Sequence, residues 1–359
     1  MARNTIRLQY EQKMGNLLSK YRGAPQDKNM KRILGIDLLR ALAILYIVGF
    51  WHLLNYTHAI PNYNNIITYR LTLIVLGTFV LISGYFLGGK HISRNSLFPF
   101  YKKRLLRIYP PYLIAVLIFF ALGLSDGATA LKAILGVSMF IRPAPPTLWF
   151  ITMLLFFYFL TPFFVSLAEQ GIIRYLCSYI ILFCTFMGYE YLSKELFHYY
   201  YLDIRIAAYL APFMTGVYVA KNNIIENIEN KAKLILFIVA IIMFIISCYL
   251  NSEHRSINLL FSIPVITIFP LLIFSFFKQL EFTSLLAQRI IIFLSTASYF
   301  MYLFHRPFYK IIPKLYFPNT SIMQLLFLVT ICLPIIIIAS YLLQNMYDNI
   351  LNSLTKRST

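Results

Sequence analysis

Residues 35–56 read GIDLLRALAILYIVGFWHLLNY, an apolar run interrupted by three side chains that can carry charge near neutral pH: Asp37, Arg40 and His52. About 20 apolar residues are enough for a helix to cross the hydrocarbon core of a bilayer. This stretch therefore predicts a membrane-spanning helix near the start of the chain.

The rest of the chain has the same character. Of its 359 residues, 59% are apolar and 13% charged, with a mean hydropathy of +0.70, which excludes a soluble globular protein and a disordered chain. We expect an all-α polytopic membrane protein of about ten transmembrane helices, near 34–56, 67–88, 108–125, 147–168, 172–190, 205–220, 233–250, 257–277, 290–310 and 321–344. The third, sixth and ninth carry prolines at or inside their ends: Pro110, Pro111, Pro212 and Pro307.

The basic residues predict the orientation. With the N-terminus inside, 22 Lys and Arg residues fall on the inner side and 9 on the outer side, which favours two cytoplasmic termini in the cell (inner) membrane. The net charge of +19 is then explained by topology and contact with membrane lipid, so no nucleic-acid partner is expected.

No repeat or appended soluble domain is found. We expect a basic cytoplasmic extension (1–32) without a cleavable signal, a membrane domain (33–345) and a cytoplasmic tail (346–359).

Two further segments carry structural expectations. Residues 126–146 are apolar enough to lie on the outer face or dip into it without spanning the membrane. The four cysteines, Cys177, Cys184, Cys248 and Cys332, lie in apolar runs without metal-ligand spacing, so we expect small buried residues, no metal site and no disulfide.

Ionisable side chains inside the membrane are costly and are candidates for function. Asp37 and Arg40 share a helical face and can form an ion pair at the cytoplasmic end of the first span; the alternative is a plain interfacial anchor. His52 lies about 18 Å further along the helix axis, in the outer half of the bilayer. Its imidazole suits a general base, and the alternative is a packed, hydrogen-bonded histidine.

The basic run before the third span contains Lys102, Lys103, Arg104 and Arg107. If this segment is helical, Arg104 and Arg107 share a face that can bind phosphate oxygens, and the alternative is a topology determinant against anionic lipid.

Three other features lie at the ends of spans. Ser83, Gly84 and Tyr85 end the second span, where packing is the ordinary explanation. Trp149 lies at an outer span entrance, as interfacial tryptophans do. His305 lies at a depth comparable to that of His52, so the two histidines either share a polar cavity or lie at the interface.

Taken in order, these segments resemble the acyltransferase 3 family of integral membrane acyltransferases. The resemblance rests on Asp-x-x-Arg and a later His in the first span, Ser-Gly-aromatic closing the second, Arg-x-x-Arg-Ile-x-Pro opening the third, Leu-Trp-Phe at the fourth, and a late Ser-Tyr-x-x-Tyr-Leu-x-His-x-Pro. Such proteins have about ten spans and move an acyl group, usually acetyl, from cytoplasmic acyl-CoA to a hydroxyl of a glycan or another envelope molecule.

The resemblance implies roles for individual residues. Arg40 and His52 correspond to the first-span basic residue and the essential histidine, Asp37 to the preceding acid, and His305 to the late histidine. The remaining implied positions are the cytoplasmic arginine pair Arg104 and Arg107 with Lys103 beside it, the small-residue turn Ser83 to Tyr85, and the aromatic Trp149. The resemblance implies acetyl-CoA as donor substrate, a saccharide acceptor and no permanently bound cofactor, and it leaves the oligomeric state open.

One departure from the family pattern concerns spacing. The family has ten residues between the basic residue and the histidine, and here eleven intervene, which would rotate His52 about 120° away from Arg40 on a regular helix. We therefore expect a π-bulge between Leu45 and Trp51, eased by Gly49.

A transporter or flippase for a lipid-linked saccharide is the rival function. It would show two similar halves or paired broken helices, and the sequence contains neither.

Overall fold

The computed structural model describes residues 32–227, 229–250 and 255–356; most of the predicted N-terminal extension lies outside this part of the chain. The described residues form helices and no strands, which confirms an all-α polytopic membrane protein. The α-helices are α2 (Leu34–Tyr46), α3 (Ile66–Gly88), α4 (Leu97–Ala121), α5 (Gly127–Ile134), α6 (Trp149–Glu169), α7 (Ile172–Phe197), α8 (Arg205–Lys221), α9 (Ile224–Asn227), α10 (Asn230–Tyr249), α11 (Arg255–Lys278), α12 (Leu285–Leu315), α13 (Ser321–Phe327) and α14 (Leu333–Lys356). Short π or 3-10 segments are η1 (Ile47–His52), η2 (Leu53–Tyr56), η3 (Arg94–Ser96) and η4 (Leu328–Cys332).

Nine helices in the described residues are long and apolar enough to cross a membrane. The sixth expected span, 205–220, corresponds to α8, which has only 17 residues, the lower limit for a span. Most side chains of α8 are buried, and the Tyr175 hydroxyl of α7 donates to the Met214 carbonyl at 2.7 Å. The short α8 is therefore enclosed by protein, which explains why it does not need the length of a lipid-facing helix.

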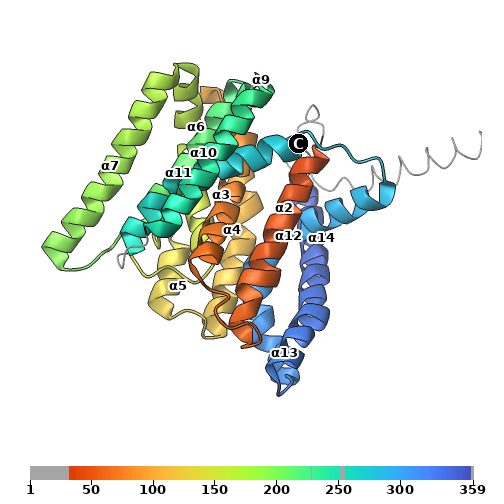
Figure 1. Cartoon of the computed structure of the whole chain (residues 1–359). Helices are drawn as coiled ribbons and strands as arrows, with labels where there is room; N and C mark the ends of the chain where they lie inside the picture. The colour runs from red at the N-terminus through yellow and green to blue at the C-terminus, as the bar shows by residue number, and fades with distance from the viewer. Residues whose placement is uncertain (1–31, 228, 251–254, 357–359) are drawn as a thin grey trace, which may run out of the picture.

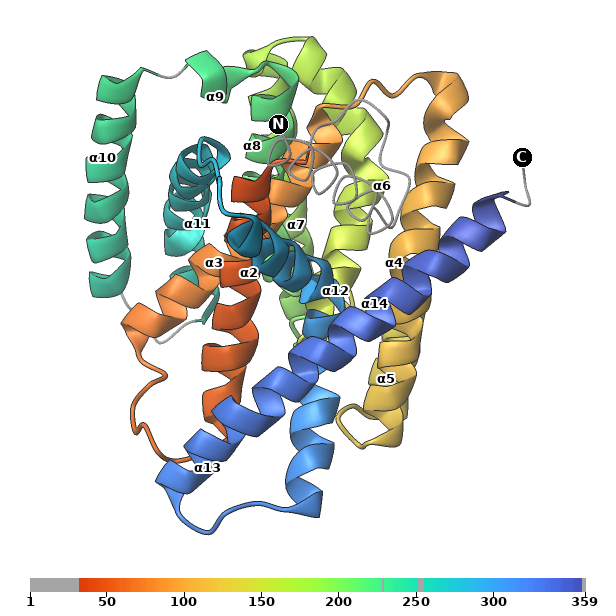
Figure 2. The ribbon, with the colours of Figure 1, turned by 90° about the vertical axis from the view of Figure 1, so that its right-hand side faces the viewer.

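The arrangement of the helices agrees with an even number of crossings. The start of α2 and the end of α14 lie on the same side of the bundle in both views (Figures 1 and 2). α7 and α10 stand at the periphery, where they leave most of their side chains exposed. This position corrects the expectation for two cysteines: Cys177 and Cys184 on α7 are exposed, whereas Cys332 is buried.

The third span begins earlier than expected. α4 starts at Leu97 instead of residue 108, and Pro110 and Pro111 lie inside it. Proline cannot donate to the carbonyl four residues before it, so Pro110 frees the Leu106 carbonyl, which accepts a hydrogen bond from the Tyr347 hydroxyl of α14. Similarly, α12 continues through Pro307 to Leu315, and α14 continues to Lys356, beyond the expected end at 344.

Residues 126–146 dip into the bundle without spanning it, as expected. α5 turns back along α4, where the Tyr109 hydroxyl donates to the Ile134 carbonyl at 2.8 Å and the Tyr112 hydroxyl to the Ala133 carbonyl at 3.1 Å. Ser138 is completely buried beyond this turn. The segment therefore fills space between α4 and α6 inside the protein.

Candidate active site

The first span contains the expected π-bulge. α2 is regular to Tyr46, residues Ile47–His52 form a π-helix, and a 3-10 turn follows. The wider π-turn absorbs the extra residue between Arg40 and His52. His52 is consequently buried against α12 instead of facing lipid, and the prediction of a bulge is confirmed with its end at His52 instead of Trp51.

Two histidines from opposite ends of the chain meet in the core. His52 Nδ1 lies 2.9 Å from His305 Nε2, and the ring planes are 13° apart. His305 is completely buried, so the interfacial alternative for this residue is excluded. His305 Nδ1 in turn lies 2.9 Å from the Met301 carbonyl oxygen, one turn earlier on α12.

These contacts define the proton positions when both rings are neutral. A carbonyl oxygen only accepts, so His305 must carry its proton on Nδ1 and leave Nε2 as an acceptor. His52 then donates from Nδ1, and the lone pair of His52 Nε2 is left unused by this chain of hydrogen bonds. The pair therefore presents His52 as a base whose tautomer and orientation are held by His305.

Asp37 and Arg40 form a second polar group, closer to the start of α2. Arg40 Nη1 lies 3.6 Å from Asp37 Oδ1, and Arg40 Nη2 donates to Ser298 Oγ at 3.2 Å. Ser295 Oγ donates to Asp37 Oδ1 at 2.6 Å, and Arg32 also pairs with this carboxylate. The Arg40 side chain keeps 34% of its surface exposed, whereas that of Asp37 keeps 10%. Asp37 therefore holds a guanidinium that can still contact a ligand.

The basic cluster lies on the first turns of α4, so the segment is helical and Arg104 and Arg107 lie on one face. Lys103 and Arg107 are exposed, and the Arg104 guanidinium lies 5.9 Å from the centre of the Phe100 ring. Arg107 is among the charges that act on Arg40. The structure thus brings the α4 cations and the first-span arginine to one side of the bundle.

Trp149 has a different environment from that expected of an interfacial tryptophan. It is 8% exposed, and the Arg205 guanidinium lies 3.7 Å from its ring centre. Arg205 also pairs with Asp203, in the loop before α8. Burial would raise the pKa of Asp203, but hydrogen bonds and charge from Arg205 outweigh it and lower that pKa. Trp149 therefore belongs to a fixed polar cluster on the outer side.

The triplet Ser83, Gly84 and Tyr85 lies away from the histidine pair, at the contact of α3 with α8 and α11. A Cβ on Gly84 would lie 2.2 Å from the Phe213 carbonyl oxygen, so this position requires glycine for close packing. Ser83 donates to the Phe79 carbonyl at 2.8 Å, and Tyr85 accepts from Lys278 at 2.6 Å. Tyr85 also lines a hollow of about 270 Å³ at the ends of α3 and α8.

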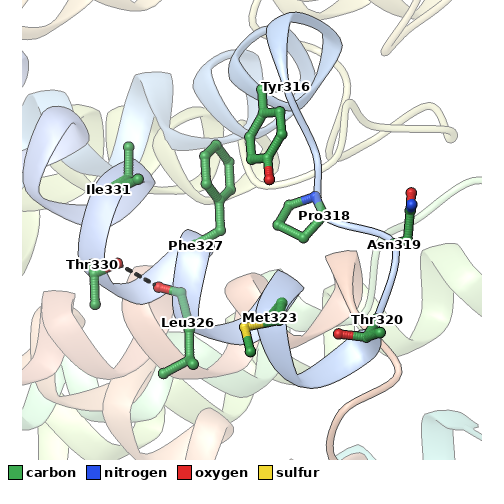
Figure 3. A pocket seen from close by; sticks show the side chains of 9 residues that line it. All are labelled: Tyr316, Pro318, Asn319, Thr320, Met323, Leu326, Phe327, Thr330 and Ile331. Carbon is green, nitrogen blue, oxygen red and sulfur yellow. Dashed lines mark hydrogen bonds between the residues drawn. The ribbon is translucent and has the colours of Figure 1, made fainter.

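A larger hollow of about 420 Å³ lies at the turn from α12 to α13. Its lining comes from that turn, α13 and η4, with mostly apolar side chains around Phe327 and Met323 and with Tyr316 at one edge (Figure 3). It contains none of the histidines or arginines above. Because it offers no base and no cation, we do not place the chemistry there.

Four residues around the site were missed from the sequence: Ser295, Ser298, Tyr302 and Tyr309. Together with the predicted His305 they follow one another at steps of three and four, and all are buried. This spacing places them on one face of α12. A polar stripe inside an apolar span was the signal that could have identified α12 as the partner of the first span.

The fold and the site define a polytopic membrane protein with a buried histidine pair and a separate group of cations. Residues 33–343 match the sequence model of the acyltransferase 3 family, described as an acyltransferase domain, and the chain therefore belongs to this family. It is a multi-pass membrane acyltransferase. No curated protein and no solved structure matched the chain.

Proposed function

We propose that this protein is an O-acyltransferase of the cell (inner) membrane that moves an acetyl group from cytoplasmic acetyl-CoA to a hydroxyl of a cell-surface glycan or its precursor. The observation that carries the proposal is the pair of His52 and His305, which leaves the lone pair of His52 Nε2 unused by their hydrogen bonds. A base near neutral pH is what transfer to a hydroxyl requires.

The donor would bind at the cations of α4. Arg104 and Arg107, with Lys103 beside them, suit the phosphates of CoA because guanidinium groups bind phosphate oxygens bidentately. Arg40 lies between this group and His52 along the first span. The distance from Arg40 to His52 is about 18 Å along the helix, comparable to the extended pantetheine arm of CoA. Arg40, oriented by Asp37, would contact the donor on its way to the histidine.

The transfer step uses one proton acceptor. The acceptor oxygen attacks the thioester carbonyl while its proton passes to His52 Nε2. The carbon–sulfur bond then breaks, and the departing thiolate takes the proton from His52, which gives free CoA and an O-acyl ester. His305 keeps the hydrogen bond from His52 Nδ1 throughout and so stabilises the transient imidazolium.

Replacement of the base tests this proposal. We expect His52→Ala to lower acetyl transfer by about 100-fold or more, the usual contribution of a general base, with membrane insertion intact. The assay is transfer from labelled acetyl-CoA in proteoliposomes, together with the O-acyl esters of the cell envelope. His198→Asn is the control, because His198 is exposed and adopts a positive φ that asparagine tolerates.

Retained transfer by His52→Ala would refute the mechanism. A mass increase of one acetyl group on His52, after incubation with acetyl-CoA alone, would show that the histidine carries the acyl group itself before the acceptor attacks.

A further inference from the structure

Arg306 follows His305 directly on α12 and has no role in the mechanism above. Its guanidinium faces the Tyr56 hydroxyl at the end of the first span. Its charge also acts on His52 and on Tyr63, in the loop after that span. Arg306, Tyr56 and Tyr63 are each partly exposed, whereas both histidines are buried. Arg306 therefore lies between the histidine pair and the outer side of the protein.

Two other arginines of this side have acidic partners, and a third, the completely buried Arg70, donates to the Asn258 and Ser247 carbonyls. Arg205 pairs with Asp203, and Arg142 Nη2 lies 3.7 Å from Glu190 Oε1. Arg306 has no carboxylate within ion-pair distance in the part of the chain that the structure describes. Its Nε atom is buried and makes no hydrogen bond. A cation in this position lacks the counter-charge that would offset its desolvation.

We propose that Arg306 binds an acidic group of the acceptor, a carboxylate or a phosphate, and thereby holds a neighbouring hydroxyl at His52 Nε2. The inference rests on the proposed function and adds the chemical class of the acceptor: an acidic glycan. A planar guanidinium can form two parallel hydrogen bonds to either group. The acceptor's negative charge would supply the missing counter-charge next to the base.

The surrounding aromatic side chains fit a sugar ligand. Trp51 and Tyr63 lie edge to face, with ring centres 6.0 Å apart, and the rings of Tyr56 and Tyr309 lie 5.0 Å apart. Such rings combine flat apolar faces with polar tips, which suits both the C–H and the hydroxyl groups of a saccharide. Tyr309 is buried behind Tyr56, and the partly exposed Trp51, Tyr56 and Tyr63 would bind any sugar, so the preference for an acidic one depends on Arg306.

A binding assay on the full-length protein tests this inference separately from catalysis. The probes are two acidic sugars, glucuronate and N-acetylglucosamine 1-phosphate, and two neutral ones, glucose and N-acetylglucosamine. We expect at least one acidic probe to bind about tenfold or more tightly than its neutral counterpart, as a charge-assisted hydrogen bond provides. The stronger of the two acidic probes identifies carboxylate or phosphate as the recognised group.

Three variants complete the assay. Arg306→Gln should abolish the preference for acidic sugars, and Arg306→Lys should keep part of it because it keeps the charge without the planar fork. Lys314→Gln is the matched control, because it removes an exposed positive charge from the same helix and should leave the preference unchanged.

Equal binding of acidic and neutral sugars, binding of neither, or an unchanged preference in Arg306→Gln would each overturn the inference. A loss of acetyl transfer to all acceptors by the same factor in Arg306→Gln would indicate stabilisation of the reacting oxyanion instead, and would also overturn it. The same binding assay in His52→Ala, which lacks the proposed base, measures the preference for acidic sugars without acetyl transfer and so separates the two proposals. An acidic preference without any acetyl transfer by the wild type contradicts only the proposed function, and equal transfer to neutral and acidic sugars contradicts only the role of Arg306.

Discussion

The hydrogen bond from His52 to His305 decides which nitrogen of His52 is basic. His305 is itself oriented by the Met301 carbonyl of its own helix, so the tautomer of both rings depends on an α-helical backbone group. A backbone carbonyl does not change its protonation state, and it therefore fixes the direction of the hydrogen bonds. Replacement of the partner histidine should affect His52 through orientation, not through binding of the donor.

Two replacements of His305 separate its acceptor function from its volume. His305→Leu removes the acceptor for His52 Nδ1–H and should lower kcat for acetyl transfer by about 100-fold or more, as loss of an orienting partner does in other triads. His305→Gln retains an acceptor oxygen for His52 Nδ1–H and should keep more activity than His305→Leu. The measurement is kcat and KM for acetyl-CoA, with KM unchanged in both variants. Equal losses in the two variants would contradict an orienting role.

The π-helix of the first span compensates for the extra residue between Arg40 and His52. On a regular helix the family's step of eleven residues returns to within about 20° of the starting face, whereas the step of twelve found here does not. The segment Ile47–His52 restores the orientation. The last span contains a second π-helix, Leu328–Cys332, which no spacing argument had indicated.

A deletion and an insertion test the role of the bulge. Removal of Phe50, a half-buried residue of the π-helix, leaves a step of eleven and should allow a regular helix with His52 still facing His305. We expect transfer within about tenfold of the wild type. Insertion of one alanine after Phe50 adds about 100° of rotation and should abolish transfer. Both are measured in proteoliposomes after insertion has been confirmed, and the reverse order of activities would show that the π-geometry has another purpose.

The close packing of helix α3 against helix α8 depends on glycine residues in both helices. Gly84 and Gly216 allow the two backbones to approach so closely that a Cβ on Gly216 would lie 2.3 Å from the Leu81 carbonyl oxygen. Gly84→Ala should destabilise the protein by about 1–3 kcal/mol, because the added methyl has no space. Gly188→Ala on α7 is the control: nothing lies within 4 Å of the added Cβ, and alanine favours a helix over glycine by about 1 kcal/mol.

Thermal unfolding of the purified variants in detergent measures this difference. The melting temperature should fall for Gly84→Ala and stay equal or rise for Gly188→Ala. Similar melting temperatures for the two variants would mean that α3 and α8 separate easily.

At the scale of the whole molecule, the two polar groups lie at different depths along the bundle. The α4 cations and Arg40 lie towards the side where α2 begins, and Arg306 lies beyond His305 towards the other side. In the proposed mechanism, a donor and an acceptor would therefore reach His52 from opposite faces of the membrane. The excess of basic residues predicts that the α4 side is cytoplasmic.

Labelling of single cysteines checks this orientation. In a background in which Cys177 and Cys184 are replaced by serine, Asn64→Cys in the loop after the first span should react with a membrane-impermeant maleimide added outside intact cells. Ser93→Cys, in the loop after the second span, should react only after the membrane is opened. Both side chains are exposed, so accessibility within the protein does not bias the comparison. The opposite pattern would invert the topology.

Local patterns in the sequence determined the class of the protein, because the length of an apolar run and the position of a charge within it do not depend on distant residues. They predicted the spans, the ion pair of Asp37 with Arg40, and the bulge before His52. The predicted helix ends were less accurate. α4 passes through Pro110 because the hydroxyl of Tyr347, far along the chain, donates a hydrogen bond to the Leu106 carbonyl that the proline leaves free.

Only the tertiary structure decided which residues meet. His52 and His305 are separated by 253 positions, and no periodicity of either segment specifies that their rings face one another. The same holds for Arg40 with Ser298 and for the lone Arg306, whose missing counter-charge is visible only once its neighbours are known. The membrane imposes helices through the hydrophobic effect and backbone hydrogen bonding. The candidate active site, in contrast, depends on side-chain packing between helices that are distant in the chain.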